Sequence, residues 1–307
     1  MARSQTSVPL EIRSYQPSLW QRLKKDRWAY AFISPFYILF TIFGLYPMAL
    51  SVYLSFTRWK GVGAMEFAGL VNFALIPKDK LFWQSMTNGL IILLINVPPM
   101  LFLALVLAVI LNSGRVKGFR FFRTLIFLPF ITNMVAAGYA FRILLEKQNG
   151  LFNILLESIG LPAAPWLESV WGARISLNLL IIWAWVGYNM VIMLAGLQTI
   201  PNDLNEAAMV DGATPVQAFF RITIPLMRPV ILFTAITSTI GSFGLFTEVS
   251  ILTGGGPVNA TITPLIRIYN SAFGSYQYGL ASAEAYTFFV FIFILTIIQF
   301  RLNREQE

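Results

Sequence analysis

The chain has 307 residues, a formal net charge of +8 at pH 7, and neither cysteine nor histidine. It is 57% hydrophobic and 12% charged, with a mean hydropathy of +0.68, and this composition excludes an ordinary soluble globular domain. The lack of cysteine and histidine excludes disulfides, cysteine nucleophiles and thiolate or imidazole metal sites. We therefore expect a protein of the lipid bilayer.

The predicted elements begin with residues 1–28, a basic stretch that has no apolar core and is therefore not a cleaved signal peptide. We expect it to be a cytoplasmic amphipathic leader that lies at the membrane surface. Long apolar runs follow, and because they are continuous rather than alternating they predict membrane-spanning helices. The predicted spans are residues 29–56, 89–111, 121–145, 175–197, 230–252 and 285–300. The fold class is thus all-α and polytopic, with six transmembrane helices. The first helix and its loop take up 29–84, a five-helix core takes up 85–301, and a tail takes up 302–307.

The even number of predicted spans places both termini on one side of the membrane. If that side is the cytoplasm, most of the 22 Lys and Arg residues lie there, as the positive-inside rule requires. The same rule accounts for the net positive charge, so we expect no nucleic-acid partner. The segment between the fourth and fifth spans then faces the cytoplasm as well.

Ionisable groups are missing from the middle of every predicted span, because Glu248 and Glu284 lie near the outer ends of the fifth and sixth spans. This pattern argues against a proton-coupled carrier and against an intramembrane enzyme. The chain also has no G-x-x-x-x-G-K-[ST] nucleotide motif, and residues 253–257 (TGGGP), which lack the lysine, predict a tight turn. Energy for any uphill transport must therefore come from outside this chain.

The cytoplasmic segment 202–225 is predicted to contain a short helix over residues 204–210. Asp203 is expected to cap this helix, with Glu206 at the third helical position. Gly212 is expected to end it, because a helix stop commonly requires the left-handed conformation that glycine adopts readily.

A second short helix is predicted over residues 215–221, with Thr214 as its cap and Gln217 completing a capping box. The two helices and the bend between them are exposed to the cytoplasm. Ala207 and Ala208 give the first helix a small-residue surface that can enter a groove on another protein. The sequence therefore predicts a docking element in this segment.

The same residues resemble the EAA signature of type-1 ABC importer permeases, EAAxxDGAxxxxxFxxIxLP. The matching residues are Glu206, Ala207, Ala208, Asp211, Gly212, Ala213, Phe219, Ile222 and Pro225, with Ile224 where the pattern usually has leucine. Further stretches resemble the maltose-type carbohydrate permeases: GLVNF at Gly69, FFRTLIFLP at Phe121, GLFNILL at Gly150, AGLQTIP at Ala195, LTGGGPVNAT at Leu252 and YGLASAEAY at Tyr278. The resemblance covers nearly the whole chain after the leader. It implies a maltose-permease-like fold in which 85–301 is the ABC transmembrane type-1 domain.

The resemblance also implies a complex in the bacterial cytoplasmic (inner) membrane, with this multi-pass chain keeping both termini in the cytoplasm. The implied partners are a second homologous permease, two ABC ATPase subunits and an extracytoplasmic solute-binding protein. ATP and Mg would bind to the ATPase, so this chain is expected to hold no cofactor, no metal and no catalytic residue. The first short helix would be the coupling helix, which contacts the ATPase through Glu206, Ala207, Ala208, Asp211, Gly212 and Ala213.

Two spans carry polar and aromatic side chains at helical spacing, and these are candidates for the solute path. The candidates are Trp185, Tyr188 and Asn189 on the fourth span and Ser238 and Ser242 on the fifth. Counted from Glu206, four of them also fall where the maltose permease that binds sugar has its pocket residues. Serine stripes also serve helix packing, and Trp and Tyr also form interfacial belts, so both interpretations stay open.

Carbohydrate import is accordingly the predicted function, with the chain forming the translocation path by alternating access. The alternatives are the same machinery for a glycerol-phosphate-type polyol or another small solute, and a secondary carrier. A secondary carrier would be expected to show midplane charges or broken inverted repeats.

Overall fold

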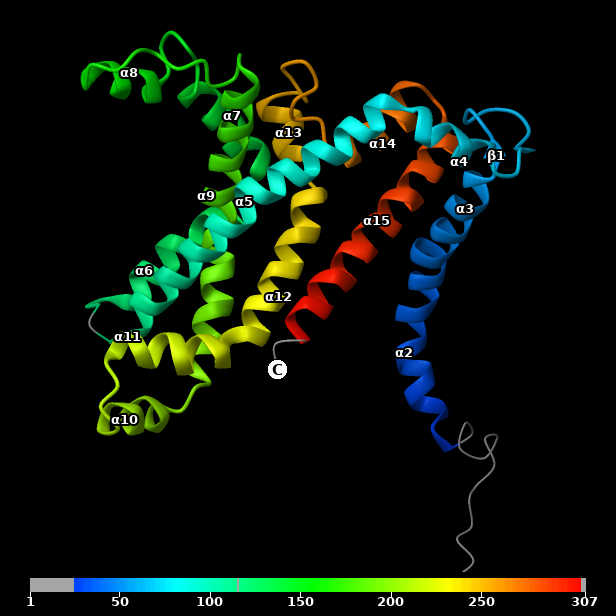
Figure 1. The fold of residues 1–307 in the computed structure, drawn as a ribbon. Helices are drawn as coiled ribbons and strands as arrows, with labels where there is room; N and C mark the ends of the chain where they lie inside the picture. The colour runs from blue at the N-terminus through cyan, green and yellow to red at the C-terminus, as the bar shows by residue number, and fades with distance from the viewer. Residues whose placement is uncertain (1–24, 115, 305–307) are drawn as a thin grey trace, which may run out of the picture. The chain divides into compact units, whose positions relative to one another are not determined.

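The computed structural model describes residues 25–114 and 116–304. These residues form helices joined by loops and one two-stranded hairpin, and their contacts divide the chain into two units with the boundary between Ser51 and Val52 (Figure 1). The predicted leader up to residue 24, and residues 305–307 of the predicted tail, lie outside the described part. Five of the described helices are long and apolar enough to cross a membrane, or six if one bent pair counts as a span. The all-α polytopic fold class is confirmed.

The first unit contains α2 (Arg27–Phe40), η1 (Thr41–Leu45) and the start of α3 (Tyr46–Ser55). Together they give an apolar helical stretch of 29 residues, which at 1.5 Å per residue exceeds the ~30 Å hydrocarbon core of a bilayer. No residue of α2 is buried, as expected for a helix whose solvent is lipid. The predicted first span, 29–56, is confirmed within two residues.

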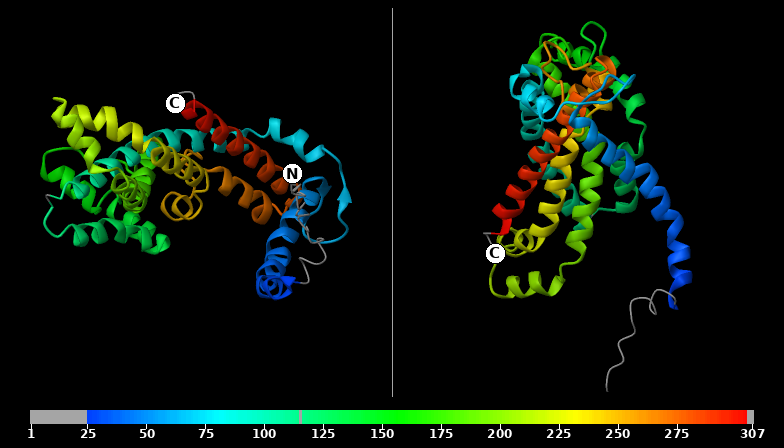
Figure 2. Two further views of the ribbon diagram at one scale, coloured as in Figure 1. Left: turned by 90° about the horizontal axis from the view of Figure 1, so that it is seen from below. Right: turned by 90° about the vertical axis from the view of Figure 1, so that its right-hand side faces the viewer.

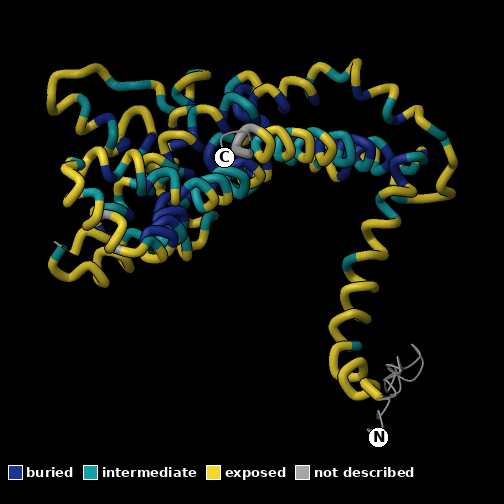
Figure 3. Tube along the Cα trace, turned by 60° about the horizontal axis from the view of Figure 1, so that its bottom comes forward, coloured by how far each residue is buried: buried dark blue, intermediate teal, exposed yellow. Residues whose placement is uncertain are grey.

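Four long helices dominate the second unit: α5 (Lys80–Asn112), α9 (Val170–Gln198), α12 (Ile224–Phe243) and α15 (Tyr278–Arg304). α5 packs against α9 and α12, and α12 also contacts both α9 and α15, as Figures 1 and 2 show. Buried and exposed stretches alternate along them (Figure 3), because one side of each helix packs while the other faces outward. Side-chain caps start two of the helices, since Asp79 accepts hydrogen bonds at the start of α5 and Ser169 does so at the start of α9.

The predicted third span, 121–145, is wrong as a single helix. α6 (Phe119–Phe127) passes into the short 3₁₀ turn η3 (Leu128–Ile131), and α7 (Met134–Leu144) then leaves at 94°. Proline at 129 cannot donate a backbone hydrogen bond, and Asn133 caps a new helix by accepting from the N–H groups of Val135 and Ala136. A helix stop and a helix start within five residues produce the bend.

The predicted fifth span, 230–252, is displaced along the chain. Helical backbone runs without a break from Pro215 to Phe243, and Gly244 caps its end by donating to the carbonyls of Ile240 and Gly241. α13 (Thr247–Leu252) is a separate short helix. Pro225 and Pro229 do not start the span, because a π-helical turn, η4 (Phe219–Thr223), precedes them and the helix continues through both.

The short elements of the second unit gather at its two ends (Figures 1 and 2). One end carries α10 (Asn202–Val210) and α11 (Pro215–Ala218). The opposite end carries α7, α13, α8 (Leu151–Ser158), α14 (Pro264–Tyr269) with η5 (Asn270–Gly274), the hairpin β1 (Thr57–Arg58) and β2 (Glu66–Phe67), α4 (Val71–Leu75) and η2 (Ile76–Lys78). The predicted tight turn also lies there, and Gly254 and Gly255 have positive φ values of 61° and 88°.

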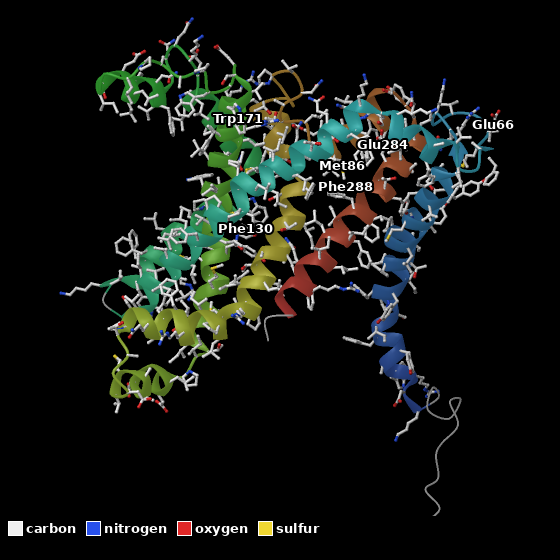
Figure 4. All side chains as sticks on the ribbon, viewed as in Figure 1. Glu66, Met86, Phe130, Trp171, Glu284 and Phe288 are labelled. Carbon is white, nitrogen blue, oxygen red and sulfur yellow. The ribbon has the colours of Figure 1, made fainter. Side chains whose placement is uncertain are left out.

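A partly buried ion-pair cluster holds α14, α15 and the start of α5 together. The Arg267 guanidinium lies 2.5 Å from an Asp79 carboxylate oxygen and 3.1 Å from a Glu284 oxygen. Burial alone would raise the pKa of Asp79, but hydrogen bonds from the Phe82 and Leu81 backbone and from Arg267 outweigh it, and the pKa is lowered. Because α15 starts at Tyr278 and not at 285 as predicted, Glu284 lies within the helix, near its outer end (Figure 4).

Candidate functional site

The candidate coupling helix is α10, which begins two residues earlier than predicted. Its N-cap is Pro201, which has no side-chain bond to the helix, so the predicted cap by Asp203 and Glu206 is wrong. Asp203 lies in the first turn instead, where a carboxylate is favoured by the positive end of the helix dipole. Glu206 makes no capping hydrogen bond and is exposed on the helix surface.

The end of α10 is a Schellman motif centred on Gly212, whose φ is +85°. The Gly212 N–H donates to the carbonyl of Met209, and the Ala213 N–H donates to that of Ala208 at 2.9 Å. Open space surrounds the position where a Gly212 side chain would begin, so the need for glycine is conformational rather than steric. The predicted left-handed helix stop is confirmed.

The second helix of the loop starts as predicted but does not stop as predicted. Thr214 and Gln217 form a capping box, with bonds of 2.8 and 3.3 Å. α11 then continues through η4 into α12 instead of ending near residue 221. The backbone after the loop is therefore one continuous helical element that reaches into the helix bundle.

The surface of α10 is more apolar than its alanines suggest. Ala207, Glu206 and Asp211 are exposed, while Ala208 and Ala213 are half-buried. Leu204, Met209 and Val210 are also exposed, and Val210 is 87% exposed. The sequence interpretation missed these three apolar residues, although they lie within three positions of the predicted ones. Together they give the helix an apolar surface with acidic side chains beside it.

All five predicted solute-path residues line one cavity of about 250 Å³ between α5, α9 and α12. Its lining consists of Trp185, Tyr188, Asn189, Ser238 and Ser242 together with Asn96, Met100, Ile181, Thr237, Ile240, Gly241 and Leu245. We call it the solute cavity. Asn178, which continues the same helical stripe in the sequence, is not part of this lining, and its amide donates to the carbonyl of Arg174.

Hydrogen bonds within the solute cavity join α9 to α12. The Ser238 hydroxyl donates to the Asn189 side-chain oxygen at 3.4 Å, and the Asn189 amide donates to the carbonyl of Trp185 at 3.2 Å. The Ser242 hydroxyl donates to the carbonyl of Ser238. These contacts fix the polar groups of two helices on the same side of the cavity.

Aromatic rings form one wall beside the cavity. Phe130, in the η3 turn at the bend, stacks on Tyr188 with ring centroids 4.7 Å apart and meets the edge of Trp185 at 5.2 Å. Figure 4 shows Phe130 where α6 and α9 come together. The sequence interpretation missed Phe130 because its position depends on the bend. The proline at 129 inside an apolar run is the signal that could have revealed it.

A second cavity of about 360 Å³ lies beside the coupling loop, between the ends of α5 and α9. Its lining includes Leu197, Met209, Ala218 and Phe219. This lining offers fewer polar groups and no Trp or Tyr ring, so it fits a hydroxyl-rich solute less well than the solute cavity does.

Residues 15–307 match the protein family described as "Binding-protein-dependent transport system inner membrane component". The chain belongs to this family. It is therefore a permease subunit of such a transport system, and the family predicted from the EAA signature is confirmed. The match runs through both the coupling loop and the solute cavity.

Relatives of this permease include the lactose transport system permease protein LacF of Rhizobium radiobacter, 37% identical over 281 residues that cover 90% of this chain and 94% of LacF. The arabinooligosaccharides transport system permease protein AraP of Halalkalibacterium halodurans is 32% identical and covers 89% of this chain and 87% of AraP. Among solved structures, a bacterial alginate ABC transporter in complex with an alginate pentasaccharide-bound periplasmic protein contains a chain with a TM-score of 0.81. That chain is 23% identical, with 94% of this permease and 97% of the other chain covered, and it shares the fold.

Proposed function

We propose that this permease imports a sugar or oligosaccharide, and that the solute cavity is its membrane-embedded contact with the sugar. The observation that carries this proposal is the convergence of Trp185, Tyr188, Asn189, Ser238 and Ser242 on one cavity. Aromatic faces pack on the C–H faces of sugar rings, and amides and hydroxyls bond to sugar hydroxyls. The lactose and arabinooligosaccharide permeases among its relatives support the same solute class.

The driving force in this proposal comes from ATP that is bound with Mg by two partner ATPase subunits. α10 docks in a groove of an ATPase through its exposed apolar residues and Ala207, with Glu206 making a charge contact. Because the capped loop leads into the unbroken helix from Pro215 to Phe243, a displacement of α10 moves the helix that carries Ser238 and Ser242. Closing of the ATPase pair thereby switches access to the cavity between the two sides of the membrane.

A second homologous permease and an extracytoplasmic solute-binding protein complete the proposed complex. The binding protein approaches the end of the second unit that carries α7, α8, α13 and α14, and the ATPase approaches the end that carries α10. The C-terminal end of α15 lies toward the α10 end (Figure 1), which supports a cytoplasmic C-terminus. With α6 and α7 counted together as one bent span, the six spans then place the N-terminus in the cytoplasm as well.

A polyol phosphate is the competing solute, and the lining of the cavity argues against it. The described lining residues include no Lys and no Arg, whereas proteins commonly hold phosphate with such cations or with helix N-termini.

Uptake of radiolabelled sugars by cells that carry the complete transporter tests the proposal, with lactose as the first probe. Tyr188→Ala removes the aromatic wall and Ser242→Leu fills the polar side, so both variants are expected to lose most uptake. Tyr139→Ala and Ser250→Leu change the same residue types at exposed positions outside the cavity and are expected to transport normally. Normal uptake by both cavity variants at normal expression would remove the solute cavity from the transport path.

A further inference from the structure

Asn96 lies near the middle of α5, where it closes one side of the solute cavity, and its side chain has no hydrogen-bond partner. Its surface is 0% exposed, and both the Nδ2 and the Oδ1 atoms are unpaired. A primary amide can donate two hydrogen bonds and accept two. Burying it without partners costs free energy, so an unpaired amide in a native fold requires an explanation.

Other buried asparagines of the described chain do have partners. Asn88 lies two turns before Asn96 on the same helix, and its amide donates to the carbonyls of Asn259 and Ile262 while its oxygen accepts from Arg174. Asn189, across the cavity, donates to Trp185 and accepts from Ser238. Among the buried asparagines of the described residues, Asn178 has an unpaired side-chain oxygen but a bonded nitrogen, and only Asn96 has both side-chain atoms unpaired. The fold therefore gives Asn96 no structural hydrogen bond.

The backbone next to Asn96 is also short of hydrogen-bond donors. Pro98 and Pro99 lie inside α5 and have no N–H groups, so the carbonyls four residues earlier, at Leu94 and Ile95, lose their usual helical partners. The residues on either side of these carbonyls are apolar, apart from Asn96 itself. The middle of α5 thus contains two carbonyl groups and one side-chain amide that the helix itself does not hydrogen-bond.

We propose that Asn96 is a solute-binding residue of this permease, and that its amide donates to and accepts from hydroxyl groups of an uncharged saccharide end that enters the solute cavity. This inference rests on the proposed function, because it assigns a further contact and a solute class to the same cavity. The bound saccharide supplies the partners that the fold leaves out.

The solute class follows from charge and size. The described residues that line the cavity include several amides, hydroxyls and aromatic rings but no Lys, Arg, Asp or Glu. A carboxylate or sulfonate placed there would be desolvated without an opposite charge, which is far more costly than burying a hydroxyl. The volume of about 250 Å³ lies below the roughly 300–1,000 Å³ of pockets that enclose whole drug-sized ligands. The cavity therefore takes one end of a saccharide.

The test uses the assembled transporter in proteoliposomes and two substitutions of buried asparagines. Asn96→Leu removes the amide from the cavity at nearly constant volume. Asn178→Leu is the matched control, since Asn178 is also buried and also has an unpaired side-chain oxygen but does not line the cavity. The probes are three neutral disaccharides, lactose, maltose and cellobiose, and a disaccharide that ends in a uronic acid. Uptake rates and the thermal unfolding temperature are measured for each protein.

We expect Asn96→Leu to weaken transport of the solute without lowering the stability of the protein. For the neutral disaccharide that is transported best, Asn96→Leu raises the KM by about tenfold to a hundredfold, because the partner hydroxyls lose their hydrogen bonds, while Asn178→Leu leaves the KM within about twofold. The unfolding temperature of Asn96→Leu stays equal to that of the wild type or rises, since no structural bond is lost.

Three results overturn the inference, and a fourth overturns the proposed function instead. An unchanged KM in Asn96→Leu means that Asn96 binds at most a water. A fall in unfolding temperature together with failed assembly means that the amide is structural. Transport of the uronic-acid probe in preference to all neutral ones contradicts the solute class. If the wild type transports none of the four probes, saccharide import itself is contradicted.

Discussion

The coupling loop and the helix bundle of the second unit are stabilised by contacts of very different range along the chain. In the loop, the bonds at Gly212, Ala213, Thr214 and Gln217 join residues three to five positions apart. In the bundle, Ser238 bonds to Asn189 across 49 positions and Arg267 bonds to Asp79 across 188. A loop with local bonds can keep its shape while it is displaced as a unit. In the bundle, in contrast, any shift of the helices changes the shape of the cavity. A rigid loop that moves as a unit and a cavity that responds to helix movement are the two properties that alternating access requires.

The largest effect is expected from breaking the long-range ion pairs of Arg267. Arg267→Met leaves Glu284 buried without an opposite charge, and loss of one partner of a buried pair typically costs about 3–5 kcal/mol. We expect a large fall in the unfolding temperature of the purified complex. The double variant Arg267→Met/Glu284→Gln should recover much of that loss, since the buried charge is gone. A single variant as stable as the wild type would show that the cluster does not hold the bundle.

A smaller loss is expected where α9 crosses α6. A methyl group at Gly187 would overlap the carbonyl of Ile126, so Gly187→Ala must push the helices apart next to Tyr188 and Phe130. Overpacking of this kind costs about 1–3 kcal/mol. Gly241→Ala is the control, because nothing lies within 4 Å of the added carbon and alanine is the better helix former. Thermal unfolding should separate the two variants, and equal stability would contradict the tight crossing.

In the coupling loop, Gly212→Ala is expected to strain the left-handed position by about 1 kcal/mol. The matched control is Gly160→Ala at the end of α8, where φ is +81° and the space is equally open. Both variants should lose similar stability, but only Gly212→Ala should weaken co-purification of the ATPase and substrate-stimulated ATP hydrolysis. Undiminished hydrolysis in the Gly212 variant would argue against α10 as the coupling helix.

The smallest expected effect is the loss of the capping box. Thr214→Ala removes the cap of α11 and costs about 0.5 kcal/mol, at the lower end of the range for such caps because the site is exposed. Hydrogen exchange of the amides of residues 216–218 should accelerate, with little change in the bundle. Ser169→Ala, which removes the cap of α9, should accelerate exchange only at the start of α9. Unchanged exchange in the loop would mean that the continuous helix alone holds α11.

The sequence predicted the local features better than the distant ones, for a physical reason. Thr214, Gln217 and Gly212 act on neighbours a few positions away, so their spacing alone was informative. The cap by Asp203 failed because Pro201 starts α10 earlier, and both interpretations satisfy the same local propensities. Helical spacing placed Trp185 and Tyr188 on one stripe and Ser238 and Ser242 on another, and the family resemblance assigned both stripes to one pocket.

Phe130 and Asn96 could not be found in this way, because each depends on tertiary geometry. Phe130 reaches Tyr188 only through the bend after α6, which a hydropathy pattern does not contain. Asn96 looks like a single polar residue in an apolar helix until the packing of α5 against α9 and α12 places it on the cavity. The same limitation made span three wrong, since the proline and asparagine signals were outweighed by continuous hydrophobicity. Span five was wrong because the helix continues through its prolines and ends at Gly244 inside an apolar run.

The central claim, that the solute cavity opens alternately to the two sides of the membrane and binds the transported sugar, can be tested with one introduced thiol. The chain contains no cysteine, so Ser242→Cys introduces the single reactive thiol of this subunit. Labelling of this subunit can be measured after the subunits are separated on a denaturing gel. The assembled transporter is treated with a membrane-impermeant thiol reagent from either side, with and without ATP and the transported sugar. We predict labelling from opposite sides in the ATP-free and ATP-bound states and protection by the sugar in at least one of them. Labelling that ignores both ATP and the sugar would contradict the claim.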